Sequence, residues 1–298
     1  MKEIKYMDRK TGNVLKEKVP GAGWLKWLYH NPAGKLALDM LVKRKFISRW
    51  YGWLMDTPSS RNRITEFVRD LDIDMNEILK PLDQFSSFND FFTRELKPGC
   101  RSVDLNSESI VSPADGKITA FADMDALHTF FVKGQEFSLD SFLQDRMLSK
   151  KYAGGAMMII RLAPADYHRF HFPAEGRTTL TRQIDGDYCS VSPYAVKDRM
   201  RIYWENKREY SELRTETAGD ILMCEVGATM VGSIVQKYIP DTITGKGQLK
   251  GWFKFGGSTV ILLFEKDKIR VDEDIIRNTI SGYETTVKVG ERIALALG

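Results

Sequence analysis

Cysteine is scarce in this chain, and the few cysteines it has lie far apart. The 298 residues include three, Cys100, Cys189 and Cys224, and none belongs to a Cys-x-x-Cys pair. An odd number at such spacing predicts neither a disulfide framework nor a zinc site. No stretch reaches the roughly eighteen uncharged apolar residues of a membrane-spanning helix, and the first twelve residues, MKEIKYMDRKTG, are too polar for a signal peptide. We therefore expect a protein that neither spans a membrane nor is exported, and that works on the cytoplasmic side of a cell.

Net charge is also low, at +4, but the positive charge is concentrated at one end of the chain. Residues 1–60 hold 12 Lys and Arg against 5 Asp and Glu, so the remainder is slightly acidic. The same end contains the aromatic stretch GWLKWLYH and the longer stretch GKLALDMLVKRKFISRWYGWLM. In the longer stretch, apolar and tryptophan side chains alternate with the basic residues Lys43, Arg44, Lys45 and Arg49.

Three explanations fit this basic, tryptophan-rich segment. A helix of this kind can lie in a membrane interface, with its rings at the acyl boundary and its cations near anionic headgroups. A core helix with a solvated basic face gives the same pattern and is the commoner arrangement. A basic aromatic patch can also contact nucleic acid. The segment alone leaves all three open.

The pattern of the chain changes near residue 100. Before it, apolar residues at helical spacing predict one helix beginning near Ile64 and another over SFNDFFTREL. After it, short runs rich in β-branched and aromatic residues predict strands; they include GKITAF, AMMIIRLA, DILMCEVGATMVGSIVQ, STVILLFE and TTVKVGERIALAL. We expect an α+β fold, with a mostly helical, membrane-associating segment over residues 1–100. A β-rich body of packed, mainly antiparallel sheets follows over residues 101–298.

Three stretches of the β-rich part carry residues capable of chemistry. His168 and His171 lie in APADYHRFHFP, and no further His or Cys cluster accompanies them, so a zinc site is not predicted. Asp115 in SPADGKI occupies a turn sequence, and turn chemistry alone explains it. Ser258 in FKFGGSTVILLF follows two glycines, and a glycine bulge at the mouth of a strand is its structural explanation. A catalytic histidine needs a nucleophile to deprotonate and a carboxylate to orient it, and Ser258 and Asp115 are the candidates.

The Gly-Ser peptide bond has a reactivity of its own. When a base removes the Ser258 proton and Oγ approaches the carbonyl of Gly257, the acyl group can move from nitrogen to oxygen, so that the backbone becomes an ester. Glycine suits the position before the serine because it has no Cβ to block the attack and tolerates strained backbone angles. Elimination across the serine then expels the upstream carboxylate, and hydration with loss of ammonia gives a pyruvoyl group. The stretch does not match the Gly-x-Ser-x-Gly nucleophile elbow, which disfavours a conventional α/β-hydrolase.

Five stretches together resemble the phosphatidylserine decarboxylases, pyruvoyl enzymes that convert phosphatidylserine to phosphatidylethanolamine. They are FNDFFTREL, SPADGKI, DYHRFHFP, EVGATMVGSI and FKFGGSTVILLF, in family order from about residue 85 to 290. Each stretch is weak evidence alone, and the ordered set is highly specific. The family's cleavage tripeptide is most often Leu-Gly-Ser, and Gly-Gly-Ser matches a bacterial subgroup. The turn aspartate is more often preceded by Val or Cys than by Ala114, a change that leaves the carboxylate in place.

The resemblance implies that the chain cuts itself. Ser258 matches the residue that becomes the pyruvoyl group, which is the covalent cofactor, and Gly257–Ser258 matches the cleaved bond. The products would be a large chain of residues 1–257 and a small chain of residues 258–298. Both would stay folded together, because the apolar strand after the cut belongs in the common core.

The resemblance also implies a role for each remaining candidate. His171 matches the base for self-cleavage, Asp115 matches the carboxylate that orients it, and His168 matches the histidine of the decarboxylation step. The substrate amine would form a Schiff base with the pyruvoyl carbonyl, which takes up the electron pair as CO₂ leaves. A histidine with a pKa near neutral can then return a proton to the substrate.

The implied substrate is an anionic, two-tailed lipid, so the membrane explanation of the basic segment becomes the favoured one. We expect a peripheral protein on the cytoplasmic side of the cell membrane that binds phosphatidylserine in an anionic membrane. We also expect a homo-oligomer of the cleaved heterodimer, with no nucleic-acid partner and no metal. Two alternatives remain: a serine hydrolase that uses Ser258, His171 and Asp115 without cutting itself, and a non-enzymatic membrane-binding module in which these residues are structural turns.

Overall fold

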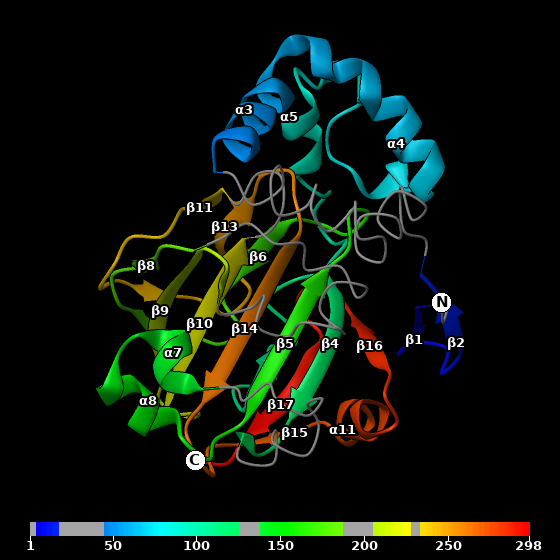
Figure 1. The fold of residues 1–298 in the computed structure, drawn as a ribbon. Coiled ribbons are helices and arrows are strands. Elements are labelled where there is room, and N and C mark those ends of the chain that lie inside the picture. Colours follow the sequence, from blue (N-terminus) through cyan, green and yellow to red (C-terminus); the bar gives the residue numbers. More distant parts are fainter. Residues whose placement is uncertain (1–3, 18–44, 125–137, 187–204, 228–232) are drawn as a thin grey trace, which may run out of the picture.

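A large β-sheet runs through the body of the protein (Figure 1). The computed structural model describes residues 4–17, 45–124, 138–186, 205–227 and 233–298. The strands of the large sheet are β1 (Lys5–Met7), β2 (Val14–Lys16), β4 (Gly116–Phe121), β5 (Met157–Leu162), β7 (Gly176–Thr178), β8 (Arg182–Ile184), β9 (Arg208–Arg214), β10 (Asp220–Gly227), β12 (Ile243–Thr244), β14 (Ser258–Phe264) and β16 (Glu284–Val287). Their order is β12-β7-β9-β10-β14-β5-β4-β16-β1-β2, with β8 paired to β9. Only the pairing of β1 with β16 is parallel within the described part, so the prediction of mainly antiparallel sheets is confirmed.

Two smaller antiparallel sheets and several helices complete the body. One sheet has the order β11-β13-β6 and the other the order β15-β17-β3. These strands are β3 (Ser109–Val111), β6 (Arg169–His171), β11 (Ile234–Gln236), β13 (Leu249–Phe253), β15 (Ile269–Val271) and β17 (Arg292–Ala296). The helices of the body are α7 (Leu139–Leu143), α8 (Arg146–Tyr152) and α11 (Glu273–Ile280).

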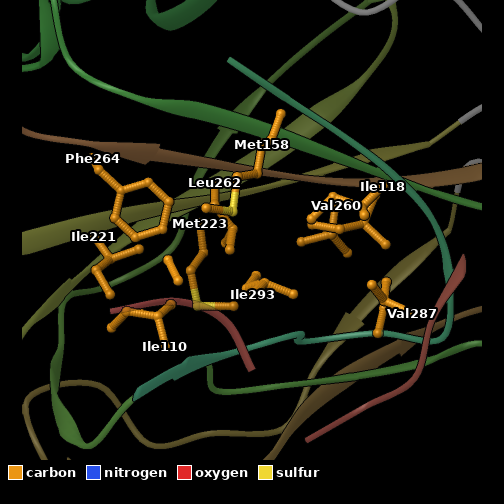
Figure 2. Close-up of a cluster of buried hydrophobic side chains, with 14 of the residues drawn as sticks. Ile110, Ile118, Met158, Ile221, Met223, Val260, Leu262, Phe264, Val287 and Ile293 are labelled. Carbon is orange, nitrogen blue, oxygen red and sulfur yellow. The ribbon is translucent and has the colours of Figure 1, made fainter. Parts of the chain in front are cut away.

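Strand β14 lies between β10 and β5, and all seven of its residues are buried. Successive side chains of a strand point to opposite faces, so the unbroken run TVILLF supplies two cores at once. Val260, Leu262 and Phe264 join a cluster shared with the two smaller sheets, which Figure 2 shows, whereas Ile261 and Leu263 join a second cluster with α7 and α8. Each fully buried side chain of this size stabilises the fold by about 1.5–3 kcal/mol.

Residues 45–92 form a helical cap at one end of the large sheet (Figure 1). Its elements are α3 (Lys45–Asp56), α4 (Ile64–Leu71), α5 (Phe88–Phe92) and three 3₁₀ helices, Pro58–Arg63, Met75–Glu77 and Leu82–Gln84. The cap has its own apolar core, in which phenylalanines predominate, and Phe255 from the loop before β14 packs against it. The helix predicted to begin near Ile64 is confirmed as α4, and the one predicted over residues 87–96 is shorter, as α5.

The prediction of a mostly helical segment over residues 1–100 is wrong at its beginning. Strands β1 and β2 form a hairpin that joins the large sheet through β16. The guanidinium of Arg161, which is 4% exposed, binds both Glu17 after the hairpin and Glu284 of β16 at 2.6–3.0 Å. Three-residue strands carry too little periodicity to be recognised in a sequence, and these depend on a buried charge network formed with distant residues.

The structure describes only part of the segment that was predicted to associate with a membrane. Residues 18–44, which include Lys43 and Arg44, lie outside the described residues. Within the part of the chain that the structure describes, none of the helices has the length and hydropathy to cross a bilayer.

Candidate active site

Ser258 is the first residue of β14, at the end of the large sheet that faces the helical cap (Figure 1). It lies in register with Gly227, the last residue of β10, and with Leu162, the last residue of β5. Its side chain is 1% exposed, and its Oγ has no hydrogen-bond partner among the described residues. A buried hydroxyl normally has a partner, so an unpaired one at the mouth of a central strand needs an explanation.

The loop that leads into Ser258 has an unusual backbone. Gly256 adopts a φ of 153°, in a region that residues with a side chain seldom enter. Phe255, just before it, inserts its ring among the rings of the cap, 4.9 Å from Phe88 and 5.1 Å from Phe92 between centroids. The two glycines therefore bridge a fixed aromatic ring and a fixed strand.

His168 is completely buried beside this region. Its Nδ1 lies 2.8 Å from the carbonyl oxygen of Asp166, and its ring contacts that of Phe92 with 3.9 Å between centroids. A carbonyl can only accept, so Nδ1 carries the proton and Nε2, which has no partner among the described residues, presents a lone pair. Burial, assisted by the positive charge of Arg94, lowers the pKa of His168 to about 3. The ring is thus a neutral acceptor in the uncut chain.

His171 has the same tautomer as His168, with its proton on Nδ1. Its Nδ1 lies 2.9 Å from the carbonyl oxygen of Gly247, so its buried and unpartnered Nε2 also presents a lone pair. Burial lowers the pKa of His171, and both the Gly247 hydrogen bond and the negative charge of Asp115 oppose that shift. Both histidines are therefore held in the state that a general base requires.

Asp115 does not supply the hydrogen bond that orients His171, contrary to the prediction. Its carboxylate accepts from the guanidinium of Arg101 at 2.6–3.0 Å and from the backbone N–H of Val289 at 2.9 Å. The loops of Asp115 and His171 are adjacent, because the His171 amide donates to the Pro113 carbonyl. The orienting contact comes from Gly247, and Asp115 acts on the ring through its charge. Whether Asp115 serves self-cleavage stays a prediction.

Three charged residues that the sequence did not single out lie around His168. Asp166 accepts from the Lys117 ammonium at 3.0 Å and from the Ala163 amide at 2.7 Å. Burial alone would raise the pKa of Asp166, but Lys117 and this amide outweigh it and the pKa is lowered. Both residues belong to stretches that resemble the family: Asp166 begins DYHRFHFP, and Lys117 lies in SPADGKI. Their positions in these stretches could have marked them as site residues.

The third charged residue is Arg94, which is 4% exposed. Its Nη2 donates to the carbonyls of Ala165 and Asp166 at 2.7 and 3.1 Å, whereas its Nε and Nη1 have no partner among the described residues. Burial lowers the pKa of Arg94 to about 10, so the guanidinium remains charged at neutral pH. A buried cation with unused donors is suited to hold an anionic group.

The unpaired atoms define what this region can do. A buried hydroxyl, two neutral imidazoles with free lone pairs and a cation with free donors fit a serine that is deprotonated and converted, followed by chemistry on an anionic substrate. The residues also fit a carbonyl group built from Ser258, because that group would need no further ligand. In the described residues no cluster of three or more His, Cys, Asp or Glu side chains is suited to a metal ion.

Comparison with known proteins gives one consistent result. Residues 88–295 match the family model described as phosphatidylserine decarboxylase. The chain is 53% identical over 290 residues to a protein of Fusobacterium nucleatum, and the match covers 97% of each chain. It is 46% identical to a protein of Desulfitobacterium hafniense, with 98% of each chain covered, and 46% identical to one of Clostridium tetani, with 97% of each covered. Each of the three is named phosphatidylserine decarboxylase proenzyme.

The charge of Asp115 generates a prediction about His171. On the uncut Ser258→Ala chain, Asp115→Asn should move the NMR titration midpoint of His171 to lower pH, because the lost negative charge had favoured the imidazolium. His168 is the internal control: burial is the main cause of its pKa of about 3, and the charges that act on it most are those of Arg94, Asp166 and Lys117, so its ring should stay neutral from pH 8 to about pH 4 in both proteins. An unchanged His171 midpoint would show that Asp115 has no electrostatic effect on the ring.

Proposed function

The chain belongs to the phosphatidylserine decarboxylase family, and we propose that it converts phosphatidylserine to phosphatidylethanolamine and CO₂ on a pyruvoyl group made from its own Ser258. Decarboxylation of phosphatidylserine is the activity of that family, and the word proenzyme in its relatives' name implies that the chain is processed. The observation that carries the finer proposal is the buried, unpartnered Oγ of Ser258 after two glycines, with buried imidazoles whose Nε2 atoms are free.

Self-cleavage begins with a proton transfer. His171 takes the proton of Ser258 Oγ on Nε2, while Nδ1–H remains on the carbonyl of Gly247. The oxygen then attacks the carbonyl carbon of Gly257, the C–N bond breaks, and an ester replaces the peptide. Loss of the Ser258 Cα proton expels the Gly257 carboxylate and leaves dehydroalanine at the new end of the small chain. Addition of one water molecule and loss of ammonia then convert that end to the pyruvoyl group.

In the second reaction, the pyruvoyl carbonyl supplies an electron-withdrawing centre for the electron pair that remains when CO₂ leaves. In the uncut chain His168 is neutral, so it can return a proton to the substrate Cα only after it has taken one up. Its free Nε2 would take up the proton that the substrate amine loses on joining the carbonyl, and the negative charge of the bound lipid would favour that protonation. Arg94 presents its unused donors to an anionic group of the lipid, and burial of the region keeps water from competing.

We propose that the protein acts as a peripheral protein at the cytoplasmic side of the membrane. The support comes from α3, where Trp50 and Trp53 lie three residues apart, on one side of the helix, and are 55% and 63% exposed. Exposed tryptophans next to an excess of Lys and Arg suit the interface of an anionic bilayer. We further propose that the cleaved heterodimer forms a homo-oligomer.

Removing either participant in the first proton transfer should stop maturation. Ser258→Ala should leave one folded, uncut and inactive chain, and His171→Ala should cut at least about a hundredfold more slowly, because an unassisted hydroxyl is a weak nucleophile. Denaturing gels over time, with circular dichroism as the control for folding, measure both. Two normal fragments from Ser258→Ala would exclude the mechanism, and normal cutting of His171→Ala would remove that residue from its role.

The two histidines should be separable. His168→Ala should still give two chains and a small chain that reacts with carbonyl reagents, yet it should turn over little phosphatidylserine, because the proton for Cα is no longer delivered. Gel analysis, hydrazine labelling and product analysis by chromatography test this on one preparation. If His168→Ala remains uncut, the division of roles is wrong.

The exposed tryptophans should contribute to vesicle binding and not to self-cleavage or decarboxylation. Trp50→Ser with Trp53→Ser should weaken sedimentation with phosphatidylserine vesicles about tenfold or more, because two ring faces no longer leave water. Cutting and activity on a short-chain soluble substrate should be retained. Leu180→Ser, which changes a 73% exposed apolar residue of the body, is the matched control. Equal vesicle binding by both variants would exclude α3 as the interfacial element.

A further inference from the structure

The helical cap holds the chain directly ahead of the two glycines through one buried side chain, Asn89 of α5. Asn89 is 3% exposed, and its Oδ1 accepts the backbone N–H of Phe255 at 2.8 Å. Phe255 lies three residues before Ser258, in the loop of residues 254–257 between β13 and β14. The amides of Phe253 and Lys254 donate to the carbonyls of His168 and Ser233 at 2.9 and 3.0 Å, so among the described contacts the bond to Asn89 is the last backbone hydrogen bond before the two glycines.

The amide of Asn89 is itself held on its other side. Its Nδ2 donates to Oδ1 of Asp56 at 3.0 Å and lies 3.5 Å from the carbonyl oxygen of Gly52, both in α3. Asp56 in turn accepts from the Lys254 ammonium at 2.9 Å. That ion pair is well exposed and contributes little by itself. Of these polar contacts, the bonds of the buried Asn89 contribute more than the exposed ion pair, because a buried amide loses more when a partner is removed.

The side chain of Phe255 strengthens the same attachment. Its ring lies edge-on to Phe88 and Phe92 and 6.1 Å from Tyr51 between centroids. The residue is therefore held twice, by its backbone through Asn89 and by its ring through the cap.

On the downstream side, Ser258 is held by the ladder of β14 with its two neighbouring strands. Gly256 and Gly257 thus span two fixed points, and Gly256 has the φ of 153° that only glycine tolerates well. Such a backbone persists only where the surrounding structure holds it. Loss of the backbone bond at Phe255 would let the two glycines relax away from the bent arrangement that attack by Oγ on Gly257 requires.

We infer that Asn89 is a positioning residue for self-cleavage, holding the loop at residues 254–257 so that Ser258 Oγ can reach the Gly257 carbonyl. It touches none of the reacting atoms and acts through the Phe255 amide. This inference rests on the proposed function, because it concerns the rate of the self-cleavage that this function requires. A displacement of about 1 Å in a reacting group can cost up to a hundredfold in rate, so loss of this one bond should be visible in the cleavage rate.

The test follows the cutting of full-length chains made by cell-free synthesis, sampled on denaturing gels. Asn89→Leu keeps the number and branching of the side-chain heavy atoms and removes both hydrogen-bonding ends, and it should be cut about 10- to 100-fold more slowly than the wild type. The matched control is Asn278→Leu in α11, where a similarly buried amide donates to Thr285 Oγ1 at 3.0 Å far from the loop. It should lose comparable thermal stability and be cut at the normal rate.

A reversed pair separates positioning from general stability. In the double variant Asn89→Asp with Asp56→Asn, the new carboxylate still accepts the Phe255 N–H and now accepts from the amide at position 56. Cutting should return most of the way to the wild-type rate. Should Asn89→Leu fail to fold, Asn89→Ala, which removes the acceptor without adding apolar bulk, takes its place with the same expected slowing.

The outcomes are distinct. Equal cutting rates for the Asn89 and Asn278 variants at equal stability would overturn the role of Asn89, as would a reversed pair that folds and is cut no faster than Asn89→Leu. A wild-type chain that is never cut would instead overturn the proposed function.

Discussion

The whole arrangement depends on one strand that is central to the sheet and begins at the reactive residue. Hydrogen bonds to β10 and β5 fix β14 along its length, and its side chains enter cores on both faces of the sheet. Ser258 is therefore placed by a buried strand that is hydrogen-bonded on both sides, while the residues before it are a short glycine loop. A reaction at that junction can use strain in the loop without disturbing the strand.

The same constraint explains how a cut chain can remain one molecule. Residues 258–298 contribute β14, β15, α11, β16 and β17, and these pair with strands from the rest of the chain: β14 with β5 and β10, β16 with β4 and β1, and β17 with β3. Breaking the peptide bond ahead of β14 removes none of these pairings. The polar atoms that the fold leaves buried and unpaired cost stability, and the two large apolar clusters offset that cost.

How much the sequence reveals depends on whether a feature is local. The continuous apolar run of β14 and the helical spacing of α4 are local signals, and both elements form where they were predicted. The contacts of the site are not local. Gly247 is 76 residues from His171, and Asn89 is 166 residues from Phe255, which its side chain binds. Periodicity in the sequence cannot predict either hydrogen bond. Asp115 was paired with His171 by resemblance, whereas the fold places Arg101 beside it, and a guanidinium is a stronger partner for a carboxylate than a neutral ring.

The central claim is that this chain makes an electrophilic carbonyl from Ser258 by cutting itself. Intact-mass spectrometry of the purified wild-type protein tests it most directly. The account predicts two chains, residues 1–257 with an ordinary carboxylate end and residues 258–298, the latter lighter by one ammonia than the same peptide beginning with serine. The small chain should also gain the mass of a hydrazone after treatment with phenylhydrazine. A single uncut chain, or a small chain that begins with an unmodified serine, would contradict the account.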